Sequence, residues 1–146
     1  MPPPIRTLVE DYRERMQRFG GLSLVEVAEE KRISQKKADR EKALVKEAKR
    51  IGDKLPERVW TIPLDSRGKS YSSEQFAKRV ESWREERGEV CFVIGGPDGI
   101  QRELQARLGP PLSFGPMTLP HMLARVVLLE QLYRAMTILH HVPYHR

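Results

Sequence analysis

The chain has 146 residues, 39% of them hydrophobic, and this composition excludes a disordered chain. Lysine and arginine (26) outnumber aspartate and glutamate (20), so the formal net charge is +6 and a polyanionic partner is expected, nucleic acid first. The alternative is that the excess charge only keeps the protein soluble. Cys91, the single cysteine, excludes an internal disulfide and favours a reducing compartment.

The first third of the chain predicts two helices with a strand between them. Apolar residues recur at the helical period over residues 5–19, and Gly20 and Gly21 end that helix. Residues 22–27 alternate as a strand does, and a thinly apolar, basic helix then runs to Gly52. The basic residues of this region form either a phosphate-binding patch or only a solvated helix face. They are Lys31, Arg32, Lys36, Lys37, Arg40, Lys42, Lys46, Lys49 and Arg50.

Two strands and a well-capped helix are predicted next. Residues 59–64 read as a strand whose end is expected to be unpaired at Pro63, because proline has no N–H to donate. A polar loop follows at residues 65–69. Ser72 and Gln75 form a capping-box pattern for a helix that Gly88 ends. The continuous apolar run 90–94 predicts a strand buried on both faces.

The C-terminal part predicts a short helix at residues 100–108, a last strand at 112–114 and a long helix at 120–139. Charged residues interrupt the long helix, so we expect a buried helix and no membrane span. That helix is apolar almost all round, which favours a dimer interface. Alternating strands and helices predict one α/β domain over residues 1–146, with a mostly parallel sheet and helices on both faces.

Two Gly/Pro-rich segments mark the expected ligand site. Residues 95–99 follow a buried strand and open a helix, so their glycines would let a ligand approach the backbone; a tight turn is the alternative. Two prolines in residues 114–120 force an irregular backbone whose amides and carbonyls stay free for a ligand; a surface loop is the alternative. Ligands of open α/β sheets bind where strands end in this way.

The chain closes on Tyr144, His145 and Arg146, which are either a frayed tail or a substrate-facing cluster. In the second case, His145 would move a proton and Arg146 would hold phosphate. With a single cysteine in the chain, no metal site is expected.

Four stretches of the chain resemble the RlmH family: residues 92–99, 112–121, 125–135 and 143–146. Leu64, Asp65, Gly68 and Lys69 match as well, so the resemblance spans most of the chain. This family consists of small SPOUT-class methyltransferases that modify N3 of a pseudouridine in large-subunit ribosomal RNA. The resemblance implies an α/β domain with a C-terminal trefoil knot, acting as a cytoplasmic homodimer on ribosomal RNA in the assembled ribosome.

The resemblance also implies the cofactor S-adenosyl-L-methionine and the residues that bind it: Leu64, Gly95, Phe114, Gly115, Pro116, Met117, Thr118 and Leu119. Relatives carry more polar residues at positions 115 and 116, so contacts there are expected through the backbone. The N3 atom of pseudouridine carries a proton that must leave before methylation. The implied catalytic residues are His145 as base, Tyr144 and Arg146 beside it, and Arg125 and Arg134 for charge stabilisation or phosphate. The tail of one subunit would complete the cofactor site of the other.

One departure from the family concerns the beginning of the chain. Family members start with an apolar strand ahead of the first helix, whereas this chain starts at that helix, with Pro2, Pro3 and Pro4. We therefore expect lower stability, or a neighbouring chain in place of the strand.

Two functions of other classes stay open. One is a catalytically silent RNA-binding module, and the other is a nucleotide-binding α/β protein that holds phosphate at residues 95–99. Cofactor selectivity separates them from a methyltransferase.

Overall fold

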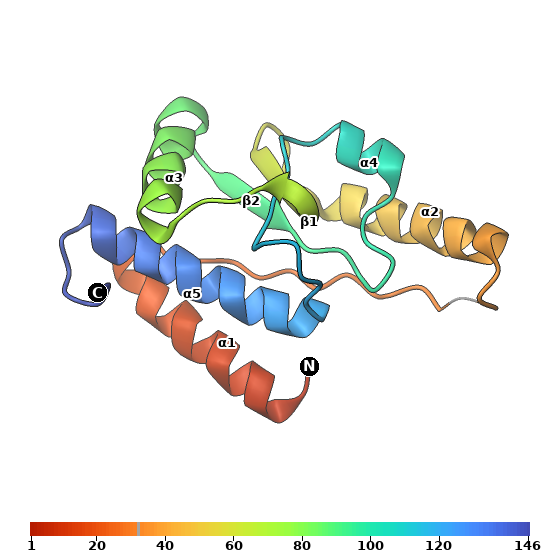
Figure 1. The fold of residues 1–146 in the computed structure, drawn as a ribbon, viewed down its shortest axis with the longest axis horizontal. Helices are drawn as coiled ribbons and strands as arrows, with labels where there is room; N and C mark the ends of the chain where they lie inside the picture. The colour runs from red at the N-terminus through yellow and green to blue at the C-terminus, as the bar shows by residue number, and fades with distance from the viewer. Residues whose placement is uncertain (32) are drawn as a thin grey trace.

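The computed structural model describes residues 1–31 and 33–146; Arg32, one of the basic candidates, lies outside them. The helices and strands in chain order are α1 (Pro3–Met16), the 3-10 turn η1 (Gln17–Phe19), α2 (Lys37–Lys54), β1 (Trp60–Lys69), α3 (Ser73–Arg87), β2 (Val90–Val93), α4 (Arg102–Ala106) and α5 (His121–Leu139). Figure 1 shows α1, α3 and α5 at one end of the molecule and α2 and α4 at the other, with the strands between them.

The sheet is parallel, as predicted. β1 pairs with β2 from Trp60 opposite Val90 to Pro63 opposite Val93. The prediction that the strand is unpaired at Pro63 is therefore wrong, because Pro63 is the last residue of β1 that pairs with β2. The prediction of a polar loop at residues 65–69 is wrong, because β1 continues through these residues to Lys69. Leu112, on the other side of β1, holds this extension by bridging to both Leu64 and Lys69.

Two other strand predictions need correction. The strand expected at residues 112–114 is reduced to the bridging residue Leu112. Residues 22–27 pair with no strand among the described residues, and a strand exists only through a neighbour's backbone. A groove of about 1890 Å³ separates this segment from β2. The outer edge of β2 has no strand partner among the described residues, so Val90, Cys91 and Phe92 are half-buried, contrary to the prediction of burial on both faces.

The hydrophobic core lies where α5 packs between α1 and α3 (Figure 1). Tyr133 of α5 meets the rings of Tyr12 and Phe19 from the N-terminal helices. Ile62 is 1% exposed and carries the core into the sheet. Because the core residues come from α1, β1, α3 and α5, with Leu112 beside them, the sheet and these three helices form one packed unit.

The predicted ends of α3 are confirmed in detail, whereas α2 continues past Gly52 to Lys54 and the helix expected at residues 100–108 is shorter, at Arg102–Ala106. The Ser72 hydroxyl accepts from the Gln75 N–H at 3.1 Å, and the Gln75 side chain accepts from the Ser72 N–H at 2.9 Å, which completes the capping box. Gly88 ends α3 with φ +79°, a conformation that a residue without a Cβ adopts freely. In the described part of the chain, no helix has the length and apolar character needed to cross a bilayer.

Candidate functional site

The three segments expected to bind a cofactor meet at one edge of the sheet. Leu64 follows the last β1–β2 pair and bridges to Leu112, and Gly95 lies two residues past the end of β2. The loop of residues 113–120, called the rim loop below, continues directly from Leu112. The carboxyl ends of parallel strands are the usual ligand edge of an α/β sheet.

The rim loop exposes both backbone and apolar groups. The Ser113 hydroxyl accepts from the Gly115 N–H at 2.9 Å and fixes a turn in which Gly115 has φ +117°. Among the described residues, the backbone N–H groups at positions 114, 117, 118 and 119 have no hydrogen-bond partner. Phe114 and Leu119 are each 37% exposed and Met117 is 82% exposed. Free backbone groups beside apolar side chains can bind a flat, partly polar ring system.

The geometry of the turn after β2 is sufficient to explain why residue 95 is a glycine, without a bound ligand. A Cβ at Gly95 would lie 2.6 Å from the carbonyl carbon and oxygen of Gly99, so the turn itself requires glycine. A Cβ at Gly96 would lie 3.4 Å from the Glu47 carboxylate and 3.5 Å from that of Glu29. Burial, together with the nearby carboxylates of Glu29 and Asp98, raises the pKa of Glu47. Carboxylates around this turn disfavour a phosphate group there.

Asp65, which continues β1 beyond Leu64, is held by three polar groups. Its carboxylate accepts from the Arg67 side chain at 2.8 and 3.1 Å, from the Arg67 backbone N–H at 2.9 Å and from the Gln105 side chain at 3.1 Å. The Arg67 guanidinium is the largest cause that holds the pKa of Asp65 far below its usual value. The carboxylate therefore ties the extension of β1 to α4 and fixes one wall of the rim.

We expect Asp65→Asn to lower the free energy of unfolding by about 1–3 kcal/mol at neutral pH, through the loss of charge-assisted hydrogen bonds. Because folding lowers the pKa of Asp65, its stabilisation is complete above the unfolded pKa and is lost as the pH falls below about 4. Urea unfolding of both proteins at about pH 7 and about pH 3 measures this. An Asp65→Asn deficit that stays constant with pH would contradict the assignment.

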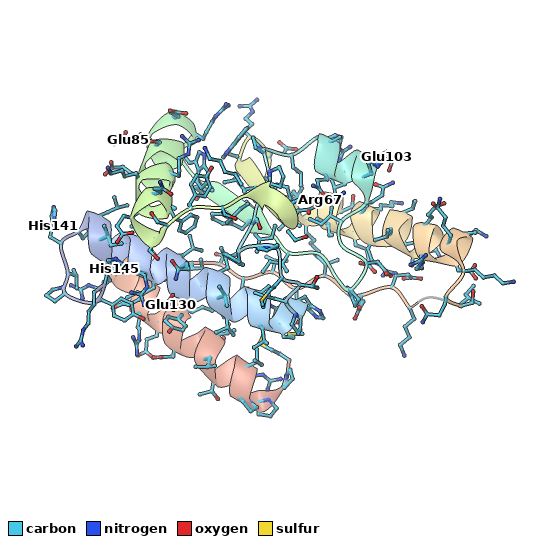
Figure 2. All side chains as sticks on the ribbon, in the orientation of Figure 1. Arg67, Glu85, Glu103, Glu130, His141 and His145 are labelled. Atoms are coloured by element: carbon cyan, nitrogen blue, oxygen red, sulfur yellow. The ribbon has the colours of Figure 1, made fainter. Side chains whose placement is uncertain are left out.

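A second group of polar residues, called the tail cluster below, joins the end of the chain to α5 and α3. It contains Glu74, Glu130, Arg134, Tyr144 and His145 (Figure 2 labels Glu130 and His145). Glu130 accepts from Arg134 at 2.6 and 2.9 Å and from the Tyr144 hydroxyl at 3.2 Å. Arg134 also lies 4.9 Å from the centre of the Tyr144 ring. The interpretation of the tail as frayed is therefore wrong for Tyr144 and His145.

Both ring nitrogens of His145 are engaged. Its Nδ1 lies 3.0 Å from Nη1 of Arg134, and its Nε2 lies 2.7 Å from Oε1 of Glu74. A guanidinium only donates, so Nδ1 is the acceptor and the proton of the neutral ring lies on Nε2, directed at Glu74. In this conformation both ring nitrogens of His145 are occupied by partners within the chain.

Tyr144 acts as a hydrogen-bond donor in this cluster. Burial is the main cause that raises its pKa, and contacts with Tyr12 and Glu130 add to the effect. The phenol therefore keeps its proton at neutral pH, and Tyr144 cannot be a general base there.

The remaining expected catalytic residues make no contact with the tail cluster that the described residues show as a hydrogen bond or ion pair. Arg125 pairs with Glu26 at 2.9 Å, and Arg146 is exposed at the chain end with no ion pair to the described residues. Glu130 lies nine residues after His121, the first residue of α5, which corresponds to about 14 Å along the helix. Within one chain, the tail cluster and the rim loop thus lie at different positions along α5.

Glu130 and Glu74 belong to the tail cluster but were not singled out from the sequence. The sequence does contain a pattern that could have identified Glu130, because this acidic residue in an apolar helix stands four residues before Arg134, at ion-pair spacing. No local sequence pattern identifies Glu74, because its contact with His145 joins positions 71 residues apart.

The basic surface follows α2. Lys46 and Arg50 pair with Glu30, at 3.5 and 2.7 Å, and Lys37 lies 4.0 Å from Glu41. Exposed basic side chains of the region that form no ion pair with the described residues are Lys31, Lys36, Arg40, Lys42 and Lys49. Part of the patch is thus a solvated, internally paired face, and the rest is free to meet phosphate.

The fold and the rim loop define an α/β protein in which Leu64, Gly95 and the rim loop meet at one edge of a parallel sheet. A family model described as "Predicted SPOUT methyltransferase" matches residues 1–145, and the chain belongs to this family. Similar relatives carry the name Ribosomal RNA large subunit methyltransferase H. The one from Magnetococcus marinus is 47% identical over 100% of this chain and 92% of its own length. The relative from Xylella fastidiosa (strain 9a5c) is 43% identical over 93% of this chain and 85% of its own length. The relative from Neisseria gonorrhoeae is 39% identical over 100% of this chain and 92% of its own length. The resemblance stated from the sequence is confirmed.

Proposed function

We propose that this protein is an S-adenosylmethionine-dependent methyltransferase that methylates N3 of a pseudouridine in large-subunit ribosomal RNA. The observation that carries the proposal is the rim loop, where free backbone groups and exposed apolar side chains meet the ends of two parallel strands. The name of the relatives, Ribosomal RNA large subunit methyltransferase H, supports the substrate class.

The rim fits the proposed cofactor. Backbone groups at positions 114 and 117–119 would recognise the polar edges of the adenosine, and Phe114, Met117 and Leu119 would cover its apolar faces. Gly115 and Pro116 offer backbone only, and Leu64 and Gly95 complete the edge. When bound, this cofactor supplies a methyl group on a positively charged sulfur. The carboxylates near Gly96 argue against the rival in which residues 95–99 bind the phosphates of a nucleotide.

The chain's contribution to the chemistry is mainly orientation and electrostatics. Loss of the N3 proton leaves negative charge on the pseudouridine ring, and Arg134, held by Glu130 and always charged, can stabilise it. His145 presents an imidazole whose orientation Arg134 and Glu74 fix, and it is the proposed acceptor of the N3 proton once Arg134 leaves Nδ1. Arg146 is free to hold a phosphate, and Arg125 could do so after leaving Glu26.

A homodimer is part of the proposal. The rim loop and the tail cluster lie at different positions along α5, so a second copy can bring its tail to this rim. Leu8 (44% exposed) and Leu123 (47% exposed) leave apolar surface on α1 and α5, two helices that pack together. Such surface is typical of an interface between subunits.

The proposal includes the trefoil knot of the SPOUT class and a cytoplasmic location. Support for the knot comes from Leu112, which bridges to both ends of residues 64–69 of β1, so this segment wraps closely around the start of the rim loop. Basic residues on and before α2 would meet the ribosomal RNA, in the assembled ribosome.

Calorimetric titration with S-adenosylmethionine, and with ATP as control, tests the proposal. We expect micromolar binding of the methyl donor alone. Binding of ATP in preference would favour a nucleotide-binding protein. A folded protein that binds large-subunit RNA but neither small molecule would be a silent RNA-binding module.

A further inference from the structure

A closed series of polar contacts connects the start of α3 to the chain end and back. The Ser73 hydroxyl donates to the Gln131 side chain at 2.8 Å, and Gln131 donates to Glu130 at 2.8 Å. Glu130 holds Arg134, which donates to His145, and His145 returns to α3 at Glu74. Two adjacent residues of one helix turn, Ser73 and Glu74, thus fix both ends of the series.

We propose that Glu74 is a positioning residue, which sets the orientation and the tautomer of His145 and so the shape of the C-terminal tail. The proposal rests on the proposed function, in which this tail faces the nucleotide to be methylated. Glu74 does not touch substrate or cofactor in this account and acts only through the imidazole.

The tautomer follows from the two partners. Arg134 can only donate to Nδ1, and the Glu74 carboxylate can only accept from Nε2, so together they select the neutral ring with its proton on Nε2. Without Glu74, nothing else among the described residues lies within hydrogen-bond distance of Nε2, and the ring can turn about the remaining bond to Arg134. The contact with His145 is the largest cause that lowers the pKa of Glu74, which therefore stays a carboxylate.

Stability depends little on this pair. The Glu74 side chain is 61% exposed, and exposed ion pairs add little to folding. A loss of activity on removing Glu74 would therefore reflect orientation of the tail and not unfolding. Glu85, at the opposite end of α3 (Figure 2), offers a matched control, because it is exposed and forms no hydrogen bond or ion pair with the described residues.

The experiment compares Glu74→Ala and Glu74→Gln with Glu85→Ala and Glu85→Gln in the full chain. The first readout is the ¹⁵N spectrum of the His145 ring, assigned with His145→Gln. We expect the Nε2-protonated form in the parent protein and in Glu74→Gln, whose amide oxygen still accepts, and a mixture of tautomers in Glu74→Ala. The second readout is methyl transfer, in which kcat should fall about 10-fold in Glu74→Ala with S-adenosylmethionine affinity unchanged. Glu74→Gln should stay within about 2-fold of the parent.

Two results would overturn the proposal: an unchanged His145 spectrum in Glu74→Ala, or kcat values that are equal for Glu74→Ala and Glu85→Ala. The spectrum needs no enzymatic activity. If the parent protein transfers no methyl group, the proposed function fails, while the spectrum still decides whether Glu74 orients His145.

Discussion

We expect Gly68→Ala to lower the free energy of unfolding by about 2–3 kcal/mol and to weaken S-adenosylmethionine binding at least about 10-fold. A Cβ at Gly68 would lie 2.6 Å from the carbonyl carbon and oxygen of Pro111. Backbone cannot move aside as a flexible side chain can, so the crossing of β1 over residues 111–112 must open. The rim loop starts at Ser113, whose N–H donates to Lys69 O at 2.9 Å in this crossing, so the loop would lose its anchor.

Gly52→Ala is the matched control for Gly68→Ala. Gly52 lies in α2, and a Cβ there would meet only the Arg107 side chain, at 3.8 Å. We expect this change to raise the free energy of unfolding by about 0.5–1 kcal/mol, because alanine is the better helix former. Urea unfolding and calorimetric titration measure both variants. Equal effects at positions 52 and 68 would show that the crossing is not tightly packed.

The second large effect is expected at Arg134. Arg134→Ala should lower kcat by about 100-fold or more, with S-adenosylmethionine affinity within about 3-fold of the parent value. The guanidinium joins Glu130 to His145 and lies against the Tyr144 ring, so its loss releases the tail from α5. It also leaves the partly buried Glu130 carboxylate without its cation, at a cost in stability.

Arg102→Ala controls for the loss of one positive charge, because Arg102 is exposed at the start of α4 and forms no ion pair with the described residues. Single-turnover methyl transfer to RNA at saturating cofactor separates the chemical step from binding. If Arg134→Ala and Arg102→Ala turned over equally fast, the tail cluster would have no part in catalysis.

The elements that were predicted well depend on local signals. The capping box at Ser72 and Gln75 and the glycine stop at Gly88 are settled within one helix turn, so the sequence alone is sufficient to place α3. The strand predictions failed where a distant partner decides the outcome. Residues 22–27 alternate correctly but face a groove, and the extension of β1 depends on a bridge to Leu112, more than 40 residues away.

The candidate site divides in the same way. The rim was predictable, because Gly/Pro-rich segments after two strands mark a sheet edge by themselves. The residues alone left Tyr144 and His145 open between a frayed tail and a substrate-facing cluster, and the family resemblance favoured the cluster. Their contacts with Glu130 and Glu74 join elements that no sequence pattern connects. The packing of α5 against α1 and α3 brings these residues together.

The most direct test of the account is methyl transfer from S-adenosylmethionine carrying an isotopic label to purified large ribosomal subunits, followed by mass spectrometry of the digested RNA. We expect one labelled nucleotide, a pseudouridine methylated at N3, and no label on RNA in which that pseudouridine is replaced by uridine. Stoichiometric binding of the cofactor and the subunits with no label transferred, or label on a different base, would contradict it.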